Sequence, residues 1–289
     1  MPDGLPTETL DPRIKQQMLR CLLKANLPSF IRKSFHTVNP GQAYHHNWHI
    51  EAIAWALQCC YEGKTKRLLI TLPPRNLKSI SASVAFPAWV LGHDPRRRII
   101  CASYANELTV KHARDFRAVV ASDWYRELFP GTRAGKDAEL EFVTTKVGYR
   151  YGTSVGGTLT GRGGSLIIID DPLKPEEALS KAARERVRQW YDGTLYSRLD
   201  SKKDDVIVLI MQRLHLDDLA GHVLEKETWE HLNLPAVAHG PERIQIGPNR
   251  FHCRDAGDLL HPEREPESVL QEAKKNLGSY HYEAQYQQT

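Results

Sequence analysis

A chain of 289 residues, 41% of them hydrophobic, is long enough to bury one large core. Charged residues make up 26% of it, and no segment is biased enough in composition to indicate disorder or a membrane protein. The net charge of +4 permits a polyanionic partner but does not demonstrate one.

The N-terminal 39 residues are interpreted as a helical extension, followed by a core over residues 40–239. The core opens with a predicted helix, in which apolar residues recur at helical spacing from Ile50 to Tyr61 before a closing Gly63. A β-branched-rich run from Arg67 to Leu72 then predicts a buried strand.

The segment after this strand has the order of a phosphate-binding loop: a tight turn, then Lys78 and Ser79, then a helix. In such loops the Lys neutralises the outer phosphates and the hydroxyl ligates Mg²⁺. Both glycines of the usual motif are missing, and Leu77 stands where the second would be. A Pro-rich turn with an incidental Lys-Ser pair is the alternative.

Further elements follow in the next hundred residues. A strand is predicted from Arg98 to Ala102, a helix behind a cap at Asn106, and an additional strand or hairpin over residues 141–150. The glycine-rich segment from Gly156 to Gly164 contains Arg162, a candidate contact to DNA phosphate or to a neighbouring subunit.

The apolar run from Ser165 to Ile169 ends in two acids, Asp170 and Asp171, as a Walker B strand does. Asp170 is positioned to hold Mg²⁺, and Asp171 to orient or deprotonate the attacking water. The alternative is a helix-capping turn, with which Pro172 is compatible.

A fourth strand is predicted from Val206 to Met211, and the acids after His215 indicate a helix start. Strands that alternate with helices imply an α/β fold, with a mostly parallel sheet covered by helices on both faces. Residues 240–289 are interpreted as a small lid or linker subdomain, with a helix from Pro266 to Leu277.

In combination, several blocks of the sequence resemble the large terminase subunits of tailed bacteriophages. The blocks are Pro73-Pro74-Arg75-Asn76-Leu77-Lys78-Ser79, Ile100 to Tyr104, Gly156 to Gly163, Ile168 to Pro172, Met211 to Gly221, and Ala284 to Gln288. The resemblance implies a P-loop NTPase fold of the additional-strand, catalytic-Glu (ASCE), RecA-like type with a small C-terminal lid, and an ATPase that drives double-stranded DNA into a procapsid.

The resemblance also assigns roles to residues. Arg75, Lys78, Asp171 and Gln212 become catalytic, and Ser79 with Asp170 becomes the Mg²⁺ site. The predicted nucleotide-binding residues are Pro74, Arg75, Asn76, Leu77, Lys78, Ser79, His46 and Asn47. Asp171 departs from the family, in which the catalytic acid is usually Glu, one methylene longer.

The implied cofactors and partners are ATP with Mg²⁺, double-stranded DNA, the portal protein, the terminase small subunit and further copies of the chain in a ring. The family's nuclease domain would follow Gln288, and because the chain stops at Thr289 no nuclease activity is expected. The five cysteines form no CxxC pair, which predicts buried free thiols and suits a reducing cytoplasm. Together with the resemblance, this implies a place in the cytoplasm of the bacterial host, with the protein neither exported nor a structural part of the virion.

Two other functions remain open from sequence. One is a helicase-like P-loop ATPase, although neither a second RecA-like lobe nor a set of helicase blocks is present. The other is a catalytically weak prophage remnant that serves only as a module for binding DNA or the portal.

Overall fold

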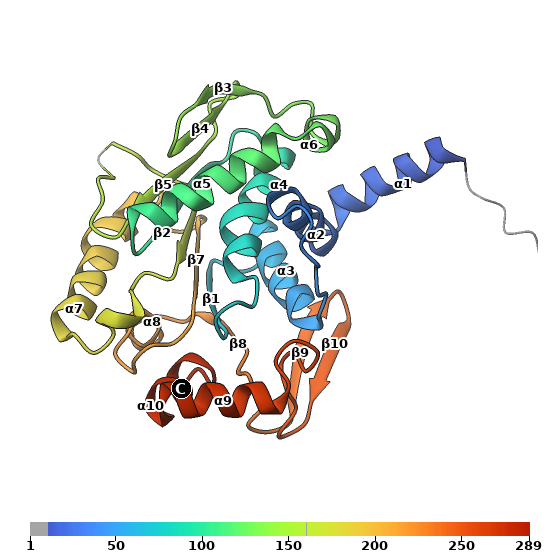
Figure 1. Ribbon diagram of the computed structural model, residues 1–289. Coiled ribbons are helices and arrows are strands. Elements are labelled where there is room, and N and C mark those ends of the chain that lie inside the picture. The colour runs from blue at the N-terminus through green and yellow to red at the C-terminus, as the bar shows by residue number, and fades with distance from the viewer. Residues whose placement is uncertain (1–10, 160) are drawn as a thin grey trace, which may run out of the picture.

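The structure, a computed structural model, describes residues 11–159 and 161–289, and it is built around one twisted sheet (Figure 1). The strands of this sheet are, in spatial order, β3 (Ala134–Asp137), β4 (Glu141–Thr144), β5 (Tyr149–Ser154), β2 (Arg98–Ser103), β6 (Leu166–Asp170), β7 (Val206–Met211), β1 (Arg67–Thr71) and β8 (Glu230–Asn233). In this order, the six strands from β5 to β8 are mutually parallel, whereas β4 pairs antiparallel with both β3 and β5. The carboxyl ends of six strands therefore meet at one edge.

Alternate residues of the central strands enter two separate cores, one on each face of the sheet. On β1, for example, Leu68 and Ile70 face one core while Leu69 faces the other. The first core is covered by α2 (Leu27–Val38), α3 (Trp48–Tyr61), the π-helical turn η1 (Ile80–Ala85), α4 (Phe86–His93), α5 (Asn106–Ala121) and α6 (Asp123–Leu128). The second is covered by α7 (Lys181–Trp190), the π-helical turn η3 (Tyr191–Leu195) and α8 (Leu219–Lys226).

The predicted α/β class and the four predicted core strands are confirmed. The segment at 141–150 is more than an added hairpin, because β5 continues to Ser154 and pairs parallel with β2. The predicted cap at Asn106 is wrong by one residue: Ala105 is the N-cap, and Asn106 begins the helix. Among the described residues, no helix combines the length and apolarity that crossing a bilayer would require.

The two N-terminal helices differ in their packing. Helix α1 (Pro12–Ala25) projects from the body, with Leu23 as its only buried residue (Figure 1). Helix α2 instead places Leu27, Phe30 and Ile31 in the first core. The interpreted boundary at residue 39 therefore does not coincide with a break in packing.

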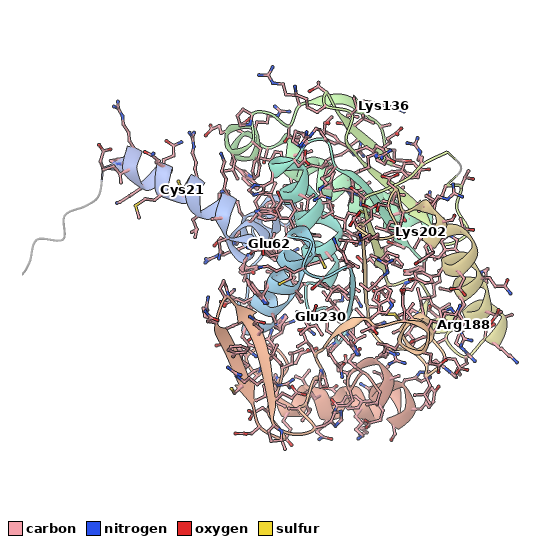
Figure 2. The ribbon with its side chains drawn as sticks, turned by 180° about the vertical axis from the view of Figure 1, so that it is seen from behind. Cys21, Glu62, Lys136, Arg188, Lys202 and Glu230 are labelled. Carbon is pink, nitrogen blue, oxygen red and sulfur yellow. The ribbon has the colours of Figure 1, made fainter. Side chains whose placement is uncertain are left out.

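The prediction of buried cysteines holds for only two of the five. Cys60 and Cys101 are buried and Cys59 is half-buried, but Cys253 is exposed, and so is Cys21 on the projecting α1 (Figure 2). Cys21 lies in an apolar stretch of sequence, which indicated burial, but the apolar side of α1 contacts little of the body.

Residues 240–289, called the C-terminal subdomain below, form a hairpin and two helices: β9 (Glu242–Gly247), β10 (Arg250–Arg254), α9 (Glu267–Leu277) and α10 (Ser279–Gln285). The hairpin lies against α3, where the rings of His252 and Trp48 stack with centroids 4.2 Å apart. The helices lie beyond the end of β1 and β8 (Figure 1).

Candidate active site

The loop over residues 73–79 leaves β1 at the carboxyl edge of the sheet. Arg75 and Leu77 both have left-handed backbone, with φ of 64° and 59°, whereas Asn76 between them does not. This conformation costs a non-glycine residue about 1–2 kcal/mol, so it persists only where the surroundings enforce it. Alternation of this kind turns successive N–H groups to one concave side, which is an anion-binding arrangement.

No acceptor for the N–H groups of residues 75–79 is found within the described part of the chain. The loop thus has the backbone geometry of a phosphate cradle although it contains no glycine. Sequence reasoning identified the loop from its Lys-Ser pair, but the two left-handed residues leave no signal in the sequence.

Lys78 follows the cradle and is largely buried. Its ammonium lies 2.8 Å from Oδ2 of Asp171, the residue after β6. The two predicted motifs, 93 positions apart in the chain, therefore meet in one ion pair. The strand between them, β7, separates β6 from β1 in the sheet, which places the pair across the carboxyl edge.

Asp170 is buried at the end of β6, and two hydroxyls donate to it. Ser79 Oγ lies 3.1 Å from Oδ1 and Ser83 Oγ lies 2.7 Å from Oδ2. Burial raises the pKa of Asp170 above its ordinary value, while the hydrogen bond from Ser83 and the charge of Lys78 oppose the shift. Ser83 was missed from sequence, although it follows Ser79 by four residues, a spacing that places both on one side of a helix.

Asp171 reaches the same site despite its short side chain. Its backbone is left-handed, with φ of 45°, and its Oδ1 accepts the N–H of Gln212 at 3.2 Å. Burial raises the pKa of Asp171, and the charge of Lys78 acts in the opposite direction. With this left-handed backbone, the carboxylate of Asp171 faces Lys78.

Two further polar side chains, neither of them predicted, contact Asp170 or the backbone of its partner Ser83. His112 Nδ1 is 3.7 Å from Asp170 Oδ2, and burial together with the charge of Arg150 lowers the pKa of His112 to about 3. Arg150 is 1% exposed and donates through Nη2 to the carbonyl of Ser83 at 3.4 Å. A neutral imidazole therefore borders the carboxylate, and a buried cation holds the backbone of Ser83, whose hydroxyl donates to that carboxylate.

Gln212 and Arg213 begin the loop after β7. Through its N–H, Arg213 donates to Oε1 of Gln288 at 2.9 Å, and its guanidinium holds Asp218, the N-cap of α8. The predicted helix start after His215 is confirmed. Gln212 is buried, and its Oε1 has no donor among the described residues.

Of the other predicted nucleotide-binding residues, Pro74 and Asn76 belong to the cradle itself, and His46 and Asn47 lie before α3. His46 pairs with Glu51 at 3.1 Å and lines a cavity of about 280 Å³, whereas Asn47 donates to the carbonyl of Leu260 at 2.7 Å. Within the described residues, neither side chain bonds to the cradle, so an adenine-binding role stays a prediction.

Arg75 and Arg162 differ in the contacts that their side chains make. The Arg75 side chain is exposed and has no acceptor among residues 11–159 and 161–289. Arg162 pairs with Glu141 and stands 4.2 Å from the centroid of the Tyr151 ring. Any contact of Arg162 with another molecule would have to compete with these partners.

The oxygens of Ser79 and Asp170 fit a magnesium ion. Mg²⁺ in nucleotide sites is held by one or two protein oxygens, with phosphates and waters completing six positions. The Ser79 hydroxyl and the Asp170 carboxylate lie 3.1 Å apart, which is close enough for both oxygens to ligate one ion. Within the described ranges, no group of three or more His, Cys, Asp or Glu forms a site of the all-protein kind.

Comparisons with known proteins agree with the fold. No family model matches the sequence, and no curated protein matches it significantly. Among solved structures, the ATPase domain of the Thermus phage P74-26 large terminase, as a variant, is similar with a TM-score of 0.52 and 14% identity, over 88% of this chain and 96% of that one. At this level of identity the likeness establishes the fold, which is that of a large-terminase ATPase domain.

Two further large terminase structures are also similar, with TM-scores of 0.49. The terminase of bacteriophage HK97 has 13% identity over 74% of this chain and 44% of its own. That of a thermophilic bacteriophage, solved with ADP, has 10% identity over 83% and 52%. The chain therefore spans about half the length of these two proteins.

Proposed function

We propose that this chain is the ATP-hydrolysing motor domain of a viral terminase large subunit, which drives double-stranded DNA into a procapsid. The observation that carries the proposal is the convergence of Lys78 with Asp171, and of Ser79 with Asp170. They lie beside a cradle whose N–H groups have no acceptor among the described residues. Each element alone is common, but together they supply anion binding, cation binding and a base.

In this proposal, each residue of the site has a separate role in the transfer of the γ-phosphoryl group to water. The cradle and Lys78 hold the phosphates, and Arg75, whose side chain is exposed, neutralises charge that develops on the γ-phosphate. Ser79 and Asp170 would hold Mg²⁺, which would supply positive charge to offset that of the phosphates.

Asp171 orients and deprotonates the attacking water in this proposal. In the structure, the ammonium of Lys78 pairs with the carboxylate of Asp171. When Lys78 turns to the phosphates, Asp171 loses its strongest stabilising charge, so its pKa rises further and the carboxylate becomes a better base. Gln212 follows this change, because its N–H bonds to Asp171.

The wider role includes partners that the fold alone does not identify. We propose that the chain acts in the host cytoplasm as a ring of copies, with the portal protein and the terminase small subunit as partners. Arg162 lies on a glycine-rich segment suited to contact a neighbouring copy or DNA phosphate, once released from Glu141.

The test is ATP turnover by the purified chain with and without double-stranded DNA, beside a strand-separation assay on a forked duplex. Packaging predicts turnover that DNA stimulates several-fold, with no strand separation. Strand separation would instead indicate a helicase. Tight binding to DNA or a portal ring without turnover would indicate a non-catalytic assembly module.

A further inference from the structure

The C-terminal subdomain contacts the phosphate cradle, although the contacting residues lie 189 positions apart in the sequence. Arg264 donates through Nη1 to the carbonyl of Arg75, the first left-handed residue of the cradle. Next to it, Glu265 accepts from the carboxamide of Asn76 at 3.4 Å. Two consecutive residues of the subdomain therefore hold two consecutive residues of the loop.

Arg264 contacts the cradle on its carbonyl side. In a loop whose N–H groups turn inward, the carbonyls turn outward, and it is a carbonyl that Arg264 contacts. Its guanidinium pairs with no carboxylate in the described part of the chain. Arg264 is thus placed to fix the loop's backbone rather than to bind nucleotide.

A loop without glycine needs such a restraint. Glycine adopts left-handed backbone freely, whereas Arg75 and Leu77 adopt it against their own preference. Inside the loop, the carboxamide of Asn76 donates to the carbonyl of Pro74 at 3.1 Å. Arg264 supplies a second hydrogen bond, from outside the loop, to the carbonyl of Arg75, one of the two strained residues.

We propose that Arg264, together with Glu265, is a positioning residue that braces the glycine-free cradle in its phosphate-binding conformation. The proposal rests on the proposed function, since it assumes that the cradle binds nucleotide. It makes nucleotide affinity depend on the docked subdomain.

The subdomain is also tied to the other side of the active site. Gln288 accepts from the N–H of Arg213, the neighbour of Gln212, and Gln287 bonds both ways with the backbone of Val237 at 3.0 and 3.2 Å. A movement of the subdomain would therefore reach both the cradle and the strand end beside Asp171. This link gives the brace a route by which it can respond to hydrolysis.

Binding of MgADP by isothermal titration calorimetry tests the brace, because a product cannot be hydrolysed during the titration. Arg264→Ala is expected to weaken binding about tenfold. Arg243→Ala is the matched control, because Arg243 lies on β9 of the same subdomain and stacks on Phe251 instead, 3.6 Å from its ring centroid. The control is expected to bind within about twofold of wild type.

Rescue separates a brace from a direct phosphate contact. Arg75→Gly removes the strain at the residue whose carbonyl Arg264 holds, so the double variant Arg264→Ala/Arg75→Gly is expected to recover affinity to within about twofold of Arg75→Gly alone. Normal binding by Arg264→Ala, or a loss that persists in the double variant, would overturn the proposal. If wild type itself binds no MgADP, the proposed function fails and the brace fails with it; thermal melting confirms that each variant is folded.

Discussion

In the proposed phosphate loop, Leu77 stands at a position where glycine would be expected. Its φ of 59° is a position that glycine fills without strain, and its side chain packs against the first core. The sequence placed Lys78 and Ser79 correctly in the loop, because their types and order are informative. It could not reveal the left-handed residues, because the restraints on them come from distant parts of the chain.

Backbone strain at Leu77 can be measured with two substitutions that both remove the side chain. We expect Leu77→Gly to be more stable than Leu77→Ala by about 1 kcal/mol, because only alanine must pay for left-handed backbone. For a domain of this size the difference corresponds to about 2 °C in melting temperature. Equal melting temperatures of the two variants, or a more stable alanine variant, would show that the position is unstrained.

His112 predicts a pH dependence of stability. Its pKa is lowered to about 3 in the folded protein, so between pH 6.5 and 3 the unfolded chain binds more protons at this residue and stability falls as the pH falls. From pH 7 to pH 5 this loss amounts to about 2 kcal/mol. His49, lowered to about 3, and His231, lowered to about 4, act in the same direction.

Asp170 and Asp171 oppose this trend, because burial raises the pKa of each. Each gains stability as the pH falls through its raised pKa toward the ordinary value. Denaturant unfolding of wild type and His112→Gln at pH 7 and pH 5 measures the net effect. We expect a smaller loss of stability in the variant; an equal loss in both proteins would contradict the role given to His112.

At the scale of elements, the strands that sequence predicted are those buried on both faces. β1, β2, β6 and β7 are nearly continuous apolar runs, and such runs can be recognised without tertiary information. The sequence of β8 is Glu-His-Leu-Asn, which has no apolar pattern typical of a strand. β8 forms because it pairs with the edge of β1, so the local sequence does not predict it. The β9–β10 hairpin was missed for a similar reason, since its stability comes from packing on α3.

The start of α8 is held by one buried carboxylate. Asp218 accepts the N–H groups of Leu214 and Gly221 at 3.0 Å and pairs with Arg213 at 2.9 Å. Asp218→Ala leaves the Arg213 guanidinium buried without its partner, so we expect a loss of about 3–5 kcal/mol in unfolding free energy. Asp218→Asn keeps a capping oxygen and is expected to lose less.

Chemical denaturation of these two variants beside wild type measures the effect. Asp217→Ala is the matched control, because Asp217 is adjacent in sequence but its side chain is 59% exposed. A loss below about 1 kcal/mol in Asp218→Ala would mean that Arg213 finds another partner.

At the scale of the whole molecule, the parallel topology does most to build the site. It brings the ends of β1, β6 and β7 to one edge, and with them Lys78, Asp170, Asp171 and Gln212. The order of motifs in the sequence was enough to infer this convergence, since parallel strands meet by their carboxyl ends. The contacts of the C-terminal subdomain were not inferable, because they join residues 75 and 264 without any pattern in either segment.

The central claim is that the glycine-free loop and the paired aspartates form a MgATP site. Equilibrium binding of ATP in the presence and absence of Mg²⁺, by wild type and Lys78→Ala, tests it most directly, with Lys64→Ala as a control at an exposed lysine paired with Glu62. We predict Mg²⁺-dependent binding by wild type and by the control, and a loss of about 100-fold in Lys78→Ala. ATP binding that depends on neither Mg²⁺ nor Lys78, or no ATP binding by wild type, would contradict the assignment of a MgATP site.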